Sequence, residues 1–280
     1  MFVVLTTSQF DVVAMPSGIV DRDVSFKSTP ERDLHANCFR PSASSEDLER
    51  GAVAVHVHGG VWNRGDREFF DDRCRALAAR GLPAVTVDYR LSGEATYPAA
   101  LQDVRSAVRW VRSERPLGFD PEAVVLVGHS AGAHLAALTA ATASQPAHSP
   151  TPTDPYGEAS TAVDGVVCFD GPYDLFGAEP GSETADFVGG DPTDVPDRYR
   201  AASPREQADG QHPPALLYHA DDDEWLTRRE TRAYRDVLNC AGVDVELKTP
   251  PGDHFFFTDD PWFERTVEHT LDFVDRVTST

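Results

Sequence analysis

Short apolar runs rich in β-branched residues alternate with amphipathic segments from about residue 50 onward. Near-continuous apolar runs of this length are typical of strands that are buried on both faces of a parallel sheet. We therefore expect six strands, at Ala52–His58, Ala84–Tyr89, Val124–Val127, Gly165–Phe169, Ala215–His219 and Val243–Leu247.

Apolar residues at helical spacing lie between and after these runs. One such stripe consists of Leu101, Val104, Val108 and Val111, and another, near the end of the sequence, of Phe263, Val267, Leu271 and Val274. A stripe of this kind forms the core-facing side of an amphipathic helix. Because strands alternate with helices, we predict an α/β fold, doubly wound, with a mostly parallel sheet and helices on both faces.

The sequence before residue 50 has weaker strand signals. Residues Phe10–Val13 and Val24–Lys27 are the candidates for leading antiparallel strands. We expect Pro16, Pro30 and Pro41 to keep these strands short, because proline cannot donate a hydrogen bond to a sheet.

Two later stretches lack a regular pattern. Residues 144–160 are rich in Pro, Thr and Ser, which predicts an exposed loop. Residues 171–214 separate two predicted strands by far more than an ordinary loop, and we expect this irregular excursion to be a lid or a substrate-binding loop. No low-complexity linker divides the chain, so we expect a single domain over residues 1–280.

The charge of the chain restricts its partners. The 46 acidic side chains outnumber the 25 basic ones and give a formal net charge of -21, so we expect neither nucleic acid nor an anionic membrane as a partner. Lys27 and Lys248 are the only lysines, a bias that resembles proteins of salt-loving microbes. We hypothesise that molar salt stabilises such an acidic surface by screening it.

Targeting and metal-binding signals are weak. The opening segment MFVVLTTSQF has too short an apolar run and no basic flank for a signal peptide, and no later stretch reaches the roughly 18 apolar residues of a membrane span. We therefore expect a soluble, cytoplasmic protein.

The four cysteines have no CxxC pair and no zinc-ligand spacing, so we expect neither a metal nor another cofactor.

A serine within the motif GHSAG, at residues 128–132, is the first candidate for catalysis. The motif follows the apolar run AVVLV and precedes the helix-forming run AHLAALTAA. A serine in such a strand-to-helix turn is held in a strained, exposed position, the arrangement called a nucleophile elbow. We therefore predict that Ser130 is a nucleophile.

A nucleophilic serine also needs donors for the oxyanion that forms on its substrate. The motif HGGVW at residues 58–62 follows a predicted strand, and its glycines let backbone amides approach a substrate oxygen. We expect the oxyanion hole to be built from the segment Gly59, Gly60 and Val61 together with the amide of Ala131.

The remaining partners are a base and an acid, which in this fold follow the nucleophile in the order acid, then histidine. His254 comes directly after the last predicted strand and is the only one of the ten histidines so placed. The acids at residues 221–224 follow the preceding strand. Spacing favours Asp223 as the acid, with Asp222 as the alternative. Because the base must be neutral to accept a proton, we expect activity to rise with pH.

Several segments together resemble a known family. Over roughly residues 50–275 the chain resembles the esterase and hormone-sensitive-lipase-like branch of the α/β-hydrolases, and the kynurenine formamidase (arylformamidase) and feruloyl-esterase-like group beside it. The resemblance is carried by HGGVW, DYRLSGEATYPAALQDVRSAVRWV, GHSAGAHLAAL, GPYDL, HADDDEWLTRRET and GDHFFF. It implies an α/β-hydrolase fold and a serine hydrolase, and it too places the acid at Asp223. The chain departs from the family pattern at Val61, where many esterases carry a third glycine, and at Ala220, commonly a glycine.

The substrate is expected to be a small carboxylic ester, or alternatively an aryl formamide such as N-formyl-kynurenine. Four aromatic residues, Trp62, Tyr173, Trp225 and Phe255, follow predicted strands and are the candidates for substrate-binding walls. For Trp62 and Trp225 the alternative is that the ring packs under the loops.

Two further interpretations compete with the hydrolase. One is a catalytically silent member of the fold that serves as a binding module, because a fold alone does not establish activity. The other is a metal hydrolase that uses His56 and His58, which would share one strand face, although no third ligand follows at a fitting spacing. The oligomeric state cannot be inferred from the sequence.

Overall fold

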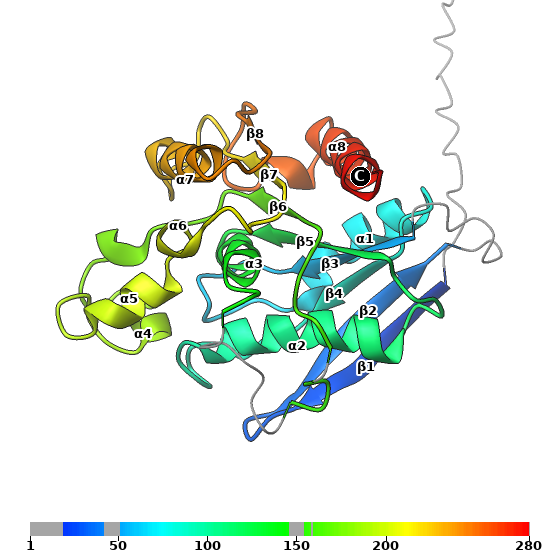
Figure 1. The fold of residues 1–280 in the computed structure, drawn as a ribbon, viewed down its shortest axis with the longest axis horizontal. Helices are drawn as coiled ribbons and strands as arrows, with labels where there is room; N and C mark the ends of the chain where they lie inside the picture. The colour runs from blue at the N-terminus through cyan, green and yellow to red at the C-terminus, as the bar shows by residue number, and fades with distance from the viewer. Residues whose placement is uncertain (1–18, 42–50, 146–153, 158, 280) are drawn as a thin grey trace, which may run out of the picture.

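The computed structural model describes residues 19–41, 51–145, 154–157 and 159–279, and its centre is an eight-stranded sheet (Figure 1). The order of the strands across the sheet is β1-β2-β4-β3-β5-β6-β7-β8. Their bounds are β1 (Ile19–Ser28), β2 (Asp33–Arg40), β3 (Ala52–Val57), β4 (Ala84–Val87), β5 (Ala123–His129), β6 (Gly165–Phe169), β7 (Ala215–Tyr218) and β8 (Val245–Lys248).

Most neighbouring strands are parallel. Only the β1–β2 and β2–β4 pairs are antiparallel, and every pair from β4 to β8 runs in the same direction. All six strands expected from the apolar runs are present, although the last begins at Val245 and not at Val243. The predicted doubly wound, mostly parallel fold is confirmed. Because parallel strands end at the same edge of a sheet, the residues that follow β3, β5, β6, β7 and β8 meet at one side of the molecule.

The first two strands agree with the prediction only in part: the expected antiparallel strand at Val24–Lys27 is confirmed, since these residues lie within β1. The two strands form a hairpin, and β2, which the apolar pattern does not predict, lies beside β4. Pro30 lies in the turn between β1 and β2 and Pro41 follows β2, so neither proline removes a donor from a strand. The expectation that Pro30 and Pro41 keep these strands short is wrong, since β1 has 10 residues and β2 has 8, and Pro16 lies outside the described residues. The predicted strand at Phe10–Val13 lies outside the described residues.

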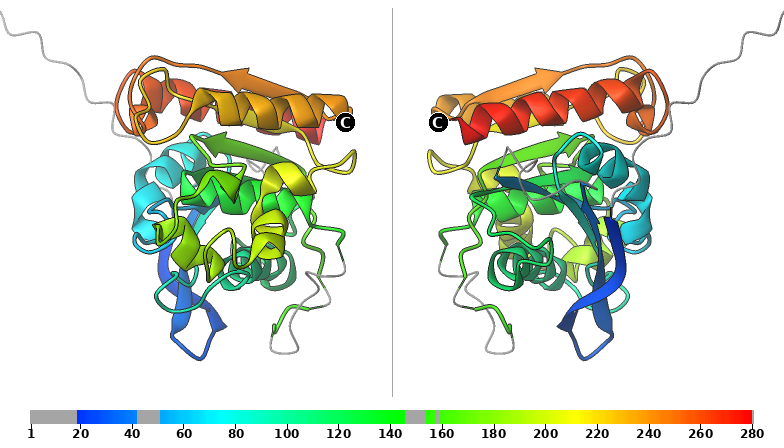
Figure 2. Two further views of the ribbon diagram at one scale, coloured as in Figure 1. Left: turned by 90° about the vertical axis from the view of Figure 1, so that its left-hand side faces the viewer. Right: turned by 90° about the vertical axis from the view of Figure 1, so that its right-hand side faces the viewer.

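Helices cover both faces of the sheet. One face packs against α2 (Ala99–Glu114), α3 (Ala131–Ala141) and α7 (Arg228–Cys240), and the other against α1 (Asp71–Ala78) and α8 (Trp262–Thr278). Figure 2 shows α7 and α8 on opposite sides of β8. Both predicted apolar stripes are buried on helices, the first on α2 and the second on α8. In the described part of the chain, no helix is long and apolar enough to cross a membrane.

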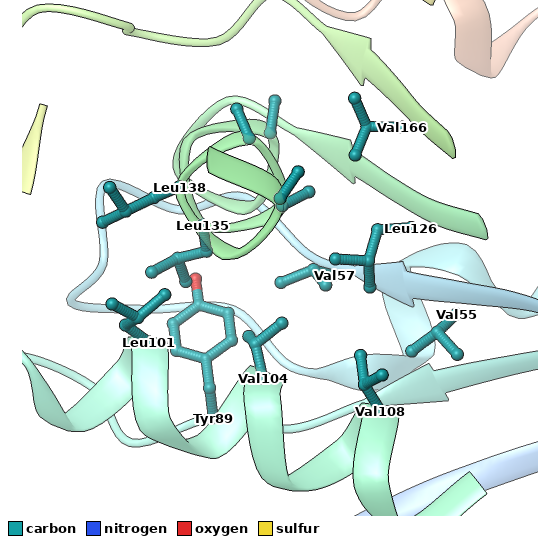
Figure 3. Close-up of a cluster of buried hydrophobic side chains, with 14 of the residues drawn as sticks. Val55, Val57, Tyr89, Leu101, Val104, Val108, Leu126, Leu135, Leu138 and Val166 are labelled. Atoms are coloured by element: carbon teal, nitrogen blue, oxygen red, sulfur yellow. The ribbon is translucent and has the colours of Figure 1, made fainter. Parts of the chain in front are cut away.

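The core beneath α2 and α3 fixes the end of β3. Leucines and valines from α2, α3 and the sheet surround the ring of Tyr89 (Figure 3). The Tyr89 hydroxyl donates a hydrogen bond of 3.1 Å to the carbonyl of His58, the residue directly after β3. This contact ties the start of the predicted oxyanion segment to the hydrophobic core.

The excursion over residues 171–214 is more regular than predicted. It contains three short helices, α4 (Glu183–Val188), α5 (Pro196–Ala202) and α6 (Pro204–Gln207), which lie together at one side of the molecule (Figure 1). Hydrogen bonds hold it to the body of the fold: the Tyr97 amide donates to Phe187 and the Tyr97 hydroxyl to Ala201. The description of this segment as irregular was wrong, because helices this short carry too few residues to show a period.

Candidate active site

Ser130 lies in the turn from β5 to α3, as predicted for a nucleophile elbow. Its backbone has φ of 53° and ψ of -120°, a conformation that is strained for a residue with a side chain. Glycines allow the turn to close: a Cβ atom on Gly128 would lie 2.3 Å from the carbonyl oxygen of Gly132, and one on Gly132 would lie 2.0 Å from that of Val57. The Ser130 amide donates to the Phe169 carbonyl at 2.8 Å, which fixes the elbow against β6.

The HGGVW segment lies directly against this elbow. A Cβ atom on Gly59 would lie 3.1 Å from the Ser130 Cβ, so only glycine permits this approach. Gly60 has φ of 112° and Val61 has φ of 45°, which is rare for a β-branched residue. Among the described residues, no acceptor takes a hydrogen bond from the Gly60 or Val61 amide. These amides are therefore able to bind an external oxygen beside Ser130.

The predicted base and acid are in direct contact. His254 Nδ1 lies 2.8 Å from Asp223 Oδ2, and both side chains are almost fully buried. The other Asp223 oxygen, Oδ1, accepts hydrogen bonds from the amides of Trp225 at 2.8 Å and Leu226 at 3.0 Å. Asp222, the alternative acid, is exposed. The structure thus brings Asp223, and not Asp222, to His254.

The charge of Asp223 is stabilised by these donors. Burial raises the pKa of its carboxyl group, but the hydrogen bonds from His254 and from the two backbone amides outweigh burial and lower the pKa to about 2. Asp223 is consequently ionised at neutral pH. An ionised carboxylate accepts a hydrogen bond from the Nδ1–H of His254, so the lone pair of the imidazole is on Nε2.

His129 connects the base to the elbow. Its Nε2 atom donates to the backbone carbonyl of His254 at 3.0 Å, and the two rings lie 4.6 Å apart. Burial lowers the pKa of His129 to about 3, so its ring is neutral and adds no positive charge beside the base. His254 Nε2 is buried and has no hydrogen-bond partner among the described residues. The structure therefore supplies a base whose accepting nitrogen is unoccupied, on a loop that contacts His129, the residue before Ser130.

Two of the four predicted substrate-binding aromatics lie at an open surface. Trp225 is 58% exposed and stacks on the His254 ring at 4.9 Å, and Phe255 is 38% exposed. Both line a hollow of about 420 Å³ whose lining residues are Asp222, Glu224, Trp225, Asp253, His254 and Phe255. These rings are placed to contact a molecule that approaches the base from solvent.

The other two aromatics are packed inside, which for Trp62 is the stated alternative and for Tyr173 corrects the expectation of a substrate-binding wall. Trp62 is 3% exposed, stacks on Phe187 at 4.6 Å and donates through Nε1 to His134 at 3.1 Å. Tyr173 is fully buried and stacks on Tyr234 of α7 at 4.4 Å. A ring that follows a strand can turn towards solvent or towards a helix, and only the tertiary partners decide which.

The predicted shared face of His56 and His58 is also wrong. His56 packs against Phe70 on the α1 side of the sheet, whereas His58 stacks on Tyr89, part of the core beneath α2. Because β3 ends at Val57, the alternation of side chains does not continue to His58. Neither ring belongs to a cluster of possible metal ligands in the described part of the chain.

One acid near the site was missed by the sequence reasoning. Asp170 directly follows β6, is fully buried, and lies with Asp223 and His254 in a cluster whose ligand atoms are within 4.8 Å of one another. A signal was available, since an acid that directly follows a buried parallel strand lies at the same edge of the sheet as Ser130 and His254. These three side chains also form a cluster of possible metal ligands, but Asp223 and His254 bind one another.

Comparison with known proteins finds a matching family model and several esterases. The BD-FAE family model matches residues 39–238. Esterase LipQ of Mycobacterium tuberculosis is 33% identical over 217 residues, which cover 74% of this chain and 51% of LipQ. Carboxylesterase NlhH of the same organism is 31% identical over 235 residues, which cover 78% of this chain and 69% of NlhH. The chain thus spans about half the length of LipQ and of another relative, esterase LipC.

A solved esterase has the same fold. The structure of Est2 from the Planctomycetes species Thermogutta terrifontis, with propionate bound, superposes with a TM-score of 0.76 at 26% sequence identity. The match covers 94% of this chain and 96% of Est2.

Proposed function

The chain belongs to the BD-FAE family, within the esterase branch of the α/β-hydrolases, and from this premise we propose that it is a serine carboxylesterase. The observation that carries the proposal is the 2.8 Å hydrogen bond between His254 Nδ1 and Asp223 Oδ2 on a loop that His129 holds against the Ser130 elbow. That arrangement supports a nucleophile, a base and an orienting acid in the roles that acyl transfer needs.

Acylation would proceed in two proton transfers. His254 Nε2 accepts the Ser130 hydroxyl proton while Oγ attacks the ester carbonyl, and Asp223 stabilises the imidazolium that results. The Ala131 amide and the Gly60 or Val61 amide donate to the oxyanion of the tetrahedral intermediate. When the intermediate collapses, the ester C–O bond breaks and His254 gives its proton to the leaving alcohol.

Deacylation repeats these steps with water. His254 takes a proton from a water molecule that attacks the acyl-serine, and the second tetrahedral intermediate uses the same amides. Its collapse returns the proton to Ser130 and releases a carboxylic acid. Every proton movement is supplied by this chain's own residues, so we expect turnover to be unchanged after dialysis against a chelator.

We propose a small acyl group for the substrate. Est2 was solved with propionate, a short carboxylate that corresponds to the acid product of a short acyl ester. The exposed rings of Trp225 and Phe255 beside His254 would favour an apolar or planar leaving group over a phosphate. The net negative charge of the chain also disfavours an anionic substrate, because like charges repel.

An acyl-length series tests this function. Hydrolysis of acetyl, butyryl and longer esters, and of N-formyl-kynurenine, is measured with the wild type, Ser130→Ala and the matched control Ser279→Ala at the far end of α8. We expect ready turnover of acetyl and butyryl esters by the wild type and the control, and a loss of several orders of magnitude in Ser130→Ala. Turnover of the formamide alone would replace the esterase with a formamidase, since a formyl pocket rejects larger acyl groups. No turnover of any substrate would favour the silent scaffold.

A further inference from the structure

Asp170 is a buried acid that the mechanism above does not use. It directly follows β6, has φ of 46° and is completely shielded from solvent. Its Oδ1 atom accepts a hydrogen bond of 2.8 Å from the Ala220 amide. Its Oδ2 atom is buried and has no donor opposite it among the described residues. Burying a carboxylate oxygen without a hydrogen-bond donor costs free energy. In a protonated carboxylic acid, Oδ2 would carry the proton and act as a donor itself.

The groups around Asp170 are mostly acidic or neutral. A carboxyl oxygen of Asp170 lies within 4.8 Å of one of Asp223, and Asp253 adds a second negative charge. His219 Nδ1 lies 3.9 Å from Asp170 Oδ1 but is engaged with the Thr231 hydroxyl at 2.9 Å. Burial lowers the pKa of His219, so this ring is neutral at neutral pH.

The remaining neighbours supply no fixed positive charge. The buried hydroxyl of Tyr173 faces the same region, and burial raises its pKa, so it is neutral. His254 belongs to the same cluster and directs its Nδ1 to Asp223. No arginine or lysine forms an ion pair with Asp170 in the part of the chain that the structure describes.

Two carboxyl groups in one buried cluster cannot both carry a charge without a large penalty, so one of them retains a proton. Asp223 accepts three hydrogen bonds, from His254 and two backbone amides, whereas Asp170 accepts one. The donors therefore favour the charge on Asp223. In agreement, burial, together with the charge of Asp223, raises the pKa of Asp170 well above its ordinary value.

We propose that Asp170 is a positioning residue: its neutral carboxyl group donates a hydrogen bond from Oδ2 to the Asp223 carboxylate and so holds Asp223 in place on His254. The inference rests on the proposed function, since it assigns Asp170 a role in the same triad. Asp170 itself touches neither the substrate nor Ser130. Its effect is transmitted through the orientation of the acid.

Two substitutions separate this role from others. Asp170→Asn keeps the shape and remains neutral, because the amide oxygen can accept from Ala220 and the amide nitrogen can donate to Asp223. We expect its kcat/KM on a butyryl ester to stay within about threefold of the wild type, with the same low-pH limb of the pH profile. Asp170→Ala removes the donor, and we expect kcat to fall about tenfold or more with little change in KM.

Three kinetic results would overturn the proposal. One is full activity in Asp170→Ala, which would show that the group positions nothing. Another is an equal loss in Asp170→Asn and Asp170→Ala. The third is a low-pH limb that moves to lower pH in Asp170→Asn, which would mean that Asp170 is ionised and stabilises the imidazolium directly.

Infrared spectroscopy detects whether the Asp170 carboxyl group is protonated, and it does not depend on enzyme activity. A difference spectrum of wild type minus Asp170→Asn at neutral pH should contain the carbonyl stretch of a protonated carboxylic acid. The matched control is Asp103→Asn, whose buried carboxylate is paired with Lys27 and Arg90 and should contribute no such band. Absence of the band from the Asp170 difference spectrum would overturn the inference. Failure of the proposed function would instead show as wild-type protein that hydrolyses no ester, whatever the spectrum.

Discussion

Asp222 and Asp223 are adjacent in the sequence, and their environments in the fold are opposite. Asp223 is held by His254 and two amides, while Asp222 is exposed. We expect Asp223→Ala to lower kcat by roughly 10³- to 10⁴-fold, because the imidazole loses the partner that sets its tautomer. Asp222→Ala should stay within a few-fold of the wild type. Steady-state hydrolysis of a butyryl ester makes the comparison, and equal small losses in the two variants would contradict the assignment.

Trp62 and Trp225 make a second contrast between single residues. Trp62 is packed between Phe187 and His134, so Trp62→Ala should lower the free energy of unfolding by about 3–5 kcal/mol. Trp225 is 58% exposed over His254, so Trp225→Ala should leave stability nearly unchanged and raise KM for aryl esters. Urea unfolding and steady-state kinetics measure the two effects. A Trp225→Ala variant that is strongly destabilised but has the wild-type KM would show that this ring, too, is structural.

The sequence alone predicted where some of these residues lie in the fold but not where others do. The positions of Ser130 in a turn after β5 and of His254 in a loop after β8 were predicted correctly, because the motifs that indicate them, a glycine-flanked turn and a loop after a strand, are local. The burial of Trp62 depends on Phe187, which lies more than a hundred residues later in the chain. No periodicity near residue 62 contains that information. Asp170 was missed for a related reason, because its role depends on a second carboxylate brought beside it by folding.

Among the elements, the turn from β5 to α3 is the most constrained. A Cβ atom on Gly132 would lie 2.0 Å from the Val57 carbonyl oxygen, so Gly132→Ala must displace either α3 or β3. We expect this variant to lose activity and several kcal/mol of stability, on the order of the largest single-residue effects. The matched control is Gly177→Ala, where nothing lies within 4 Å and stability should change by no more than about 0.5 kcal/mol. Thermal melts of the two variants make the test, and a normal, active Gly132→Ala would contradict the close approach.

The helices and strands with a long hydrophobic pattern were predicted, and those with a short or weak pattern were not. The buried parallel strands carry continuous apolar runs, and α2 and α8 carry long stripes, so these elements were predicted with small errors in their bounds. The helices α4, α5 and α6 are four to seven residues long, too short for a helical period. The strand β2 was not predicted from its sequence; it forms a strand by pairing with β1 and β4.

For the whole molecule, burial of neutral histidines predicts sensitivity to acid. Burial lowers the pKa of His56 and His129 to about 3 and that of His134 and His212 to about 4. The unfolded chain takes up these protons near pH 6.5, whereas the folded protein does not, so stability is complete above about pH 6.5 and falls as the pH drops towards 4. Two acids whose pKa burial raises, Asp170 and Glu230, act in the opposite direction, but they are two groups against four histidines.

The expected effect is large enough to measure. Each of these histidines contributes up to about 1.4 kcal/mol per pH unit within that window. Urea unfolding at pH 7 and at pH 5 should therefore give a free energy of unfolding that is several kcal/mol smaller at pH 5. Equal stability at the two values would mean that these rings are protonated, or hydrated, in the folded protein.

The central claim is that the chain acts through a covalent bond to Ser130, and a fluorophosphonate probe tests it most directly. The probe is incubated with folded wild type, His254→Ala and urea-unfolded protein, and the modified peptide is identified by mass spectrometry. We predict stoichiometric labelling of Ser130 in the folded wild type, far slower labelling in His254→Ala, and none in the unfolded protein. Labelling at another serine, or a folded wild type that does not react, would contradict the account.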